Sequence, residues 1–214
     1  MQQGRISQRS AFAWAVVSVW LTGTAYAFWS FEFKQQRSFE SARTVLFDSG
    51  ARARSAELWF REAVAPQLGG ADSRVATVVH VYSADCPCNR FTHPHLARIM
   101  SGYQHRGVGF VAAVHGPATA AAGSLASPAG LAGIQQVELR GGSDLAWIES
   151  TPAALVFDAA GRLVYFGPYS DSARCGESGG LVERVLDRML GGQTPRPQPF
   201  YGGGCFCSGA NLNL

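Results

Sequence analysis

Charge is scarce in this chain, and none of it gathers into a patch. Charged residues make up 15% of the 214 positions, and the formal net charge is only +3. Basic residues form nothing longer than isolated pairs such as Arg52 and Arg54. Because nucleic-acid-binding proteins carry clustered positive charge, we expect no nucleic-acid partner. The 47% of hydrophobic residues suffices for a packed core and argues against a disordered chain.

The chain also lacks the short motifs of several large enzyme classes. It contains no Gly-x-x-x-x-Gly-Lys-[Ser/Thr] phosphate loop, no His-Glu-x-x-His zinc motif and no Gly-x-Ser-x-Gly nucleophile elbow. Its glycine clusters at 141–142 and 202–204 follow no nucleotide-binding fingerprint and indicate a turn and a linker.

Cysteine is rare, but its spacing is informative. The five cysteines are Cys86, Cys88, Cys175, Cys205 and Cys207, so four of them form two Cys-x-Cys pairs. Five are too few for a small fold stapled by disulfides, and an odd number leaves one thiol free, bound to metal or paired with another chain. We therefore expect reactive or metal-binding cysteines rather than structural ones.

The N-terminus carries a long uncharged and apolar segment. Residues 10–31 contain no charge over 22 positions, about the length that crosses roughly 30 Å of hydrocarbon as a helix. Arg5 and Arg9 precede it and favour a cytoplasmic N-terminus. We expect residues 1–31 to be a single-pass membrane anchor, with the main domain on the periplasmic side. A cleaved signal peptide ending at Ala25-Tyr26-Ala27 is the alternative, and a buried core helix is a third interpretation.

Hydrophobic periodicity divides the remainder into a connector and helix at 32–69, a domain at 70–191 and a Pro/Gly-rich, cysteine-containing tail at 192–214. Buried strands are predicted at 75–83 and 108–114, a short strand at 137–139, and a hairpin at 153–157 and 163–166. Helices are predicted at 51–68 with Asp48 as N-cap, at 88–102, at 143–150 and at 181–190. Residues 33–50 are predicted to be a connector, and residues 118–133 stay undecided between a weak helix and a crossover. Strands that alternate with helices and then a hairpin predict an α/β fold with a mixed sheet.

Three features of this pattern resemble the thioredoxin superfamily over about residues 70–191. A strand leads through a cysteine into a helix, Cys86 lies eight residues before Pro94, and Thr151-Pro152 directly precedes a strand. The resemblance implies a thioredoxin-like three-layer fold, with a mixed central sheet flanked by helices. It implies that Cys86 is the nucleophile, that Thr151 and a cis Pro152 face it, and that His80 stands where the family has a buried acid that relays protons.

The sequence departs from the family at the cysteine motif itself. Cys86-Pro87-Cys88-Asn89 replaces Cys-x-x-Cys, so Cys88 precedes the family's resolving position and Asn89 occupies it. A helix N-terminus stabilises the thiolate of Cys86, whereas the neighbouring Asp85 opposes it. The departure argues against ordinary reductase activity.

The pairing of the cysteines stays open at this stage. A Cys86–Cys88 disulfide closes a very small ring and is expected to be strained and oxidising. Alternatively, the tail folds back, so that Cys205 and Cys207 exchange disulfides with Cys86 and Cys88. Static disulfides, including one from Cys175 to the tail, are the third interpretation.

We therefore expect thiol–disulfide exchange with protein thiols or disulfides, through Cys86 and Cys88 and without a cofactor. A metal-binding or copper-delivery module is the alternative, in which Cys86, Cys88, Cys205 and Cys207 bind Cu(I) or Zn. His93 and His95 are expected to be surface residues rather than ligands. A thioredoxin-like domain that binds a partner without catalysis is the last possibility.

Overall fold

The computed structural model describes residues 8–32, 36–38, 50–68, 74–114, 131, 133–139, 145, 147–148, 150–170, 180–193, 195 and 203–208. The chain forms two compact units, Met1–Gln36 and Arg37–Leu214.

The first unit consists mainly of one helix, α1 (Gln8–Glu32). Its stretch Ser10–Ser30 has a mean hydropathy of 1.4, and none of the most apolar window is buried. Length and composition therefore suit a membrane span, as the sequence predicts, and a signal sequence near the N-terminus has the same properties.

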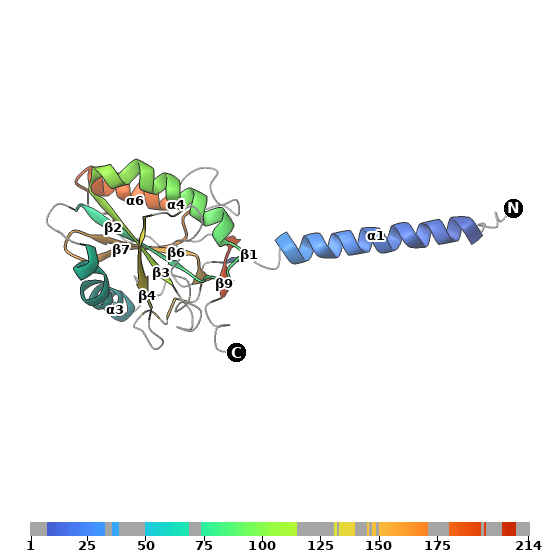
Figure 1. Ribbon diagram of the computed structural model, residues 1–214, viewed down its shortest axis with the longest axis horizontal. Helices are drawn as coiled ribbons and strands as arrows, with labels where there is room; N and C mark the ends of the chain where they lie inside the picture. Colours follow the sequence, from blue (N-terminus) through green and yellow to red (C-terminus); the bar gives the residue numbers. More distant parts are fainter. Residues whose placement is uncertain are drawn as a thin grey trace. The chain divides into compact units, whose positions relative to one another are not determined.

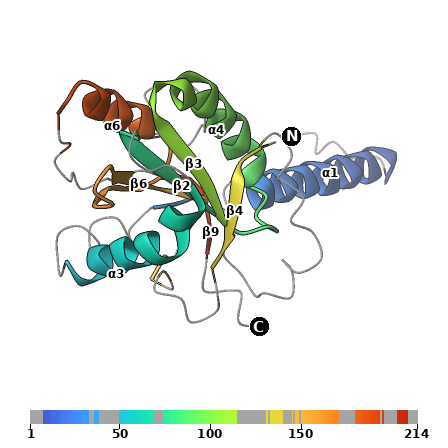
Figure 2. The ribbon, with the colours of Figure 1, turned by 60° about the vertical axis from the view of Figure 1, so that its left-hand side comes forward.

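A five-stranded sheet in the order β4-β3-β2-β6-β7 forms the centre of the second unit (Figures 1 and 2). Its strands are β2 (Ala76–Tyr82), β3 (Val108–Val114), β4 (Gln135–Glu138), β6 (Ala153–Asp158) and β7 (Leu163–Gly167). β2, β3 and β4 are parallel, whereas β6 runs antiparallel to β2, and β7 antiparallel to β6. The predicted mixed sheet is confirmed.

Helices cover both faces of this sheet (Figure 1). α4 (Asn89–Tyr103), continued by a 3₁₀ turn at Gln104–Arg106, lies with α6 (Leu181–Leu190) on one face, and α3 (Ala51–Trp59) lies on the other. Alternating residues of β2 separate two cores, because successive side chains of a strand point to opposite faces. Val79 and Val81 pack on the α3 side, and Val78 and Tyr82 on the side of α4 and α6.

The predicted helix at 51–68 has the expected extent but not a uniform geometry. After α3 the chain continues as a π-helical turn, Phe60–Val64, and a 3₁₀ turn, Ala65–Leu68. The wide turn coincides with the burial of Phe60, whose ring stacks on Phe157 at 4.2 Å between centroids. Gly50, with φ of 58°, stands at the N-cap, and Asp48 lies outside the described residues.

Several minor segments differ from the predictions. The short strand β4 begins at Gln135 rather than at Val137, and the predicted connector contains a strand, β1 (Gln36–Ser38). The predicted helix at 143–150 is wrong where the structure describes it, because residues 145, 147, 148 and 150 are not helical. Most of segment 118–133 lies outside the described residues. Ser150, the last residue of that helix prediction, begins the strand β5 (Ser150–Thr151).

The tail contributes strands as well. β8 (Gly203–Cys205) pairs with β1, and β9 (Cys207–Ser208) pairs antiparallel with β5. Part of the glycine cluster at 202–204, which the sequence indicated to be a linker, is therefore in a strand.

Candidate redox site

Cys86 and Cys88 lie in a tight turn between the central strand β2 and helix α4. The carbonyl oxygen of Ser83 accepts two hydrogen bonds, from the Cys86 amide at 3.0 Å and from Asn89 Nδ2 at 2.7 Å. These bonds fold the chain back directly after the strand ends at Tyr82. The turn therefore holds both cysteines at the carboxyl end of a buried central strand.

The same turn starts α4, for which Cys88 is the N-cap residue. The Asn89 amide donates to the Cys86 carbonyl at 3.1 Å, and the Thr92 amide and hydroxyl donate to the Cys88 carbonyl at 3.3 and 3.4 Å. Unsatisfied amides and the positive end of the helix dipole favour a negative charge here. A thiolate formed at this turn is therefore stabilised.

A cis peptide bond joins Thr151 to Pro152, as the resemblance implies. Cys86 Sγ lies 3.7 Å from the Thr151 carbonyl oxygen, and the Thr151 hydroxyl lies 3.0 Å from that of Ser83. The predicted group of Cys86, Thr151 and Pro152 is therefore assembled in space.

Each cysteine of the turn is bonded to a cysteine of the tail. Cys86 forms a disulfide with Cys207, and Cys88 forms one with Cys205, across sequence separations of 121 and 117 residues. Of the pairings left open by the sequence, the structure has the fold-back of the tail and not a Cys86–Cys88 bond. Cys175 lies outside the described residues.

Backbone pairing places the tail beside the cis-proline. Thr151 pairs with Cys207 and Ser150 with Ser208, in antiparallel register. Between the two tail cysteines, Phe206 is only 5% exposed and belongs to the apolar cluster on the α3 side of the sheet. The described part of the tail is thus held by two disulfides, two short strand pairs and one buried aromatic side chain.

Three cysteine sulfur atoms lie close enough together to bind one metal ion, but they are not thiolates. The Sγ atoms of Cys86, Cys88 and Cys207 all lie within 4.8 Å of one another. Zn and Cu(I) bind thiolates, whereas these three sulfurs and that of Cys205 belong to disulfides. The four-cysteine metal site is therefore not favoured in this oxidation state.

His80 lies in β2 at the predicted place and is completely buried. Its Nδ1 is 2.9 Å from the Tyr169 hydroxyl, and its ring lies against those of Tyr82 and His93. Burial, and secondarily the nearby His93, lowers the pKa of His80 to about 3. The ring is therefore neutral near pH 7, and its role as a proton relay stays a prediction.

Sequence reasoning placed two other histidines wrongly and missed several supporting residues. His93 and His95 are buried rather than on the surface, and His95 Nε2 lies 2.6 Å from Glu183 of α6. Helical spacing from Leu96 and Ile99 could have indicated a buried face. Ser83 and Asn89 carry no local signal, because their role is to hold the turn.

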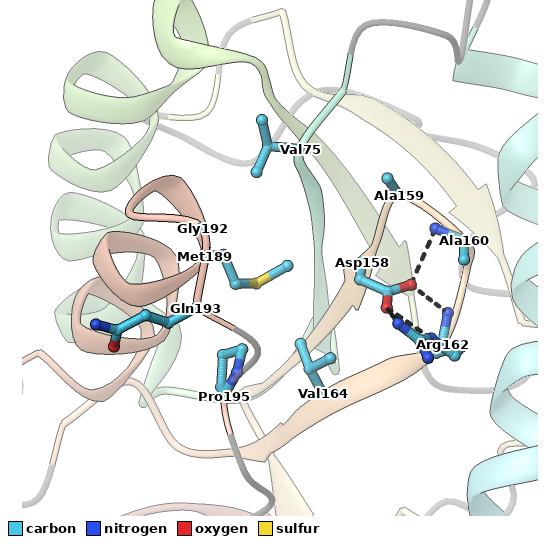
Figure 3. A pocket seen from close by; sticks show the side chains of 10 residues that line it. All are labelled: Val75, Asp158, Ala159, Ala160, Arg162, Val164, Met189, Gly192, Gln193 and Pro195. Carbon is cyan, nitrogen blue, oxygen red and sulfur yellow. Dashed lines mark hydrogen bonds and ion pairs between the residues drawn. The ribbon is translucent and has the colours of Figure 1, made fainter.

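A cavity of about 280 Å³ lies away from the cysteines (Figure 3). It is lined by Val75 before β2 and by Asp158 at the end of β6, whereas the cysteines follow the opposite end of β2. The carboxylate of Asp158 in this cavity already has partners within the chain. It accepts hydrogen bonds from the Ala160 and Arg162 amides and forms an ion pair with the Arg162 side chain at 2.7 Å.

The mixed sheet, the cysteine turn at the start of α4 and the cis-proline before β6 define a thioredoxin-like fold. A family described as a domain of unknown function, DUF6436, matches residues 57–209, and the chain belongs to this family. No curated protein matches the chain.

The solved structures that are similar to the chain include two bacterial proteins. They are an uncharacterized conserved protein from Geobacillus kaustophilus and a hypothetical protein from Sinorhizobium meliloti 1021, each 23% identical with a TM-score of 0.52. Each match covers 66% of this chain, and 79% and 82% of the respective relatives. A secreted Mycobacterium tuberculosis disulfide oxidoreductase matches at 18% identity and a TM-score of 0.37, over 57% of this chain and 86% of its own. At 23% identity, the first two support the fold alone.

Proposed function

We propose that this protein exchanges disulfides with protein thiols outside the cytoplasm. The observation that carries the proposal is the Cys86–Cys207 disulfide, which lies at the N-terminus of α4 and beside the Thr151–Pro152 cis bond. A static disulfide needs neither neighbour, whereas a reactive one gains from a helix end that stabilises the sulfur released on attack.

The exchange passes only between sulfur atoms and needs no cofactor. A partner thiolate attacks Cys86 Sγ, forms a mixed disulfide and breaks the Cys86–Cys207 bond, whose electron pair leaves on Cys207 Sγ. A second partner thiolate then attacks the partner's own sulfur in the mixed disulfide and releases Cys86 as a thiolate at the helix end. The partner is oxidised by two electrons, and the Cys86–Cys207 pair is reduced by two.

The second disulfide can join the same process. Once Cys88–Cys205 is opened, the Cys88 sulfur lies within 4.8 Å of both Cys86 and Cys207. Thiolates attack disulfides within reach, so the Cys88 thiolate can attack Cys207 Sγ and release Cys86. Cys205 then attacks Cys88 Sγ and releases Cys207, which restores Cys88–Cys205 and leaves Cys86 and Cys207 reduced. The chain thereby stores two disulfides, which accept four electrons in all.

The proposed location follows from the disulfides and from α1. Disulfides persist outside the cytosol, and α1 has the length and composition of a membrane span. In the orientation favoured by Arg5 and Arg9, α1 anchors the chain and residues 37–214 face the periplasm.

The test uses the purified full-length oxidised protein in detergent micelles and a reduced peptide with two cysteines. Alkylation and mass spectrometry then count the disulfides in both. We expect up to two peptide molecules to be oxidised per chain by the wild type, and at most one by Cys86→Ser/Cys207→Ser. Cys175→Ser is the matched control and should behave as the wild type. Disulfides that survive a large excess of peptide would show a structural role and favour a partner-binding domain.

A further inference from the structure

The chain's own tail lies where a substrate would have to lie. Cys207 is disulfide-bonded to Cys86, and its backbone pairs with that of Thr151, next to the cis-proline. Substrate recognition by an open strand edge uses such backbone pairing, with pockets for alternate side chains giving the specificity. The tail therefore shows which side chains this edge accepts.

Alternation along the tail assigns each side chain to a site. Successive residues of an extended chain point to opposite sides, and Cys205 and Cys207 both reach the cysteine turn. Phe206 points the other way and is 5% exposed, although both neighbours are half-buried. It joins the apolar cluster on the α3 side of the sheet, which also contains Leu139 and Ile148.

We propose that the tail is an internal substitute for the substrate, and that the substrates are extended protein segments with a large apolar residue directly before the reactive cysteine. The proposal rests on the proposed function and adds the chemical class of the partner. The partner's apolar side chain takes the place of Phe206, and its cysteine takes the place of Cys207.

Phe206 gives this selectivity its physical basis. A buried aromatic side chain removes a large apolar area from water, whereas alanine fills little of the same space and a polar side chain leaves its hydrogen-bonding groups without partners. Because the residue before the cysteine is fixed in place by the strand pair, its burial contributes directly to formation of the mixed disulfide.

The test isolates Cys86 in the full-length chain by changing Cys88, Cys175, Cys205 and Cys207 to Ser. Peptides of equal net charge carry Phe, Leu, Ala or Asn directly before a cysteine that is linked to thionitrobenzoate. The Cys86 thiolate attacks the peptide sulfur, forms a Cys86–peptide disulfide and expels thionitrobenzoate with the electron pair. The released chromophore reports the rate of each peptide.

We expect the Phe and Leu peptides to react ~10-fold or more faster than the Ala and Asn peptides. In this variant Phe206 of the tail still competes with the peptide's apolar side chain for the same buried position. Adding Phe206→Ala removes that competition. The rates of the Phe and Leu peptides should then rise further, while their advantage over Ala persists. Near-ultraviolet circular dichroism checks that both variants are folded, and reduced wild-type protein offers the same comparison without any substitution.

The outcomes separate this inference from the proposed function. Equal rates for all four peptides would overturn the inference and leave disulfide exchange standing. No reaction with any peptide, in the variants and in the reduced wild type, would overturn both. A preference for Ala or Asn would show that Phe206 belongs only to the packing of the tail.

Discussion

His80 and its neighbours form a buried group of polar rings beneath the cysteine turn. His80 Nδ1 contacts the Tyr169 hydroxyl, and the rings of His93 and Tyr82 complete the group. Burial lowers the pKa of His93 as well as that of His80. Both rings therefore stay neutral in the folded protein at a pH at which they are protonated in the unfolded chain.

This difference makes stability depend on pH. As the pH falls below about 6.5, the histidines of the unfolded chain become protonated while His80 in the folded protein stays neutral. The free energy of unfolding therefore decreases with falling pH, until His80 itself is protonated near pH 3. We expect His80→Gln to reduce the slope of unfolding free energy against pH between these values. The slope should not vanish, because His93 contributes with the same sign. Denaturant titrations at a series of pH values measure it.

His105 provides the matched control, since it is exposed at the end of α4. A His80→Gln protein with the slope of the wild type would contradict the buried neutral ring.

At the residue scale, the sequence predicted those site residues that lie in a recognisable local pattern. Cys86 at a strand-to-helix junction and Thr151-Pro152 before a strand are recognisable patterns, and the structure brings them within 3.7 Å. The pairing with Cys205 and Cys207 stayed undecided, because contacts across more than a hundred residues leave no periodic pattern. The burial of His93 and His95 was missed although a local signal existed, because their helical spacing from Leu96 and Ile99 indicates a buried face.

The tail strands are the elements least supported by the rest of the fold. β9 pairs with β5 over two residues, whereas β2 pairs with β3 over seven. Short strands at an edge have few hydrogen bonds and low local stability. The disulfides are therefore expected to be the main restraint on the tail.

Hydrogen exchange should reveal this difference between elements. After reduction of both disulfides, we expect the amides of β8 and β9 to exchange rapidly while those of β2 and β3 stay protected. Mass spectrometry of peptic fragments from oxidised and reduced protein makes the comparison, with the fragment containing Val79 as internal control. A tail equally protected in both states would show that Phe206 and backbone pairing suffice to hold it.

Among the elements, strong patterns were predicted well and weak ones were not. The strand at 108–114 and the helix at 181–190 have their predicted bounds, because an apolar run and an amphipathic period extend over each. The two-residue strands β5 and β9 have no pattern of their own and exist through their partners. The π-helical turn at Phe60–Val64 likewise follows from packing on the sheet rather than from helix propensity.

For the whole molecule, the two disulfides close almost the same loop. Either bond alone joins the turn after β2 to the tail and closes a loop that contains α4, β3, β4, β6, β7 and α6. Once one has formed, the other closes only the short ring made by residues 86–88 and 205–207. Their contributions to stability are therefore far from additive.

Loop entropy gives the expected magnitudes. A cross-link over such a loop stabilises by about 5 kcal/mol, and closing the short ring adds about 2 kcal/mol. We expect Cys88→Ser/Cys205→Ser, which leaves the long loop closed, to lower the free energy of unfolding by the smaller amount. Changing all four cysteines should cost about 5 kcal/mol or more. Denaturant titration measures each, with Cys175→Ser as control, and equal losses for both variants would contradict the shared loop.

The order in which these cysteines are synthesised gives the tail a consequence for biogenesis. Cys86 and Cys88 leave the ribosome before most of the domain, and their partners follow more than a hundred residues later. A nascent chain that stops before residue 205 carries both early thiols without the sulfurs that seal them. The pairing seen in the structure can therefore form only after synthesis has passed Cys207.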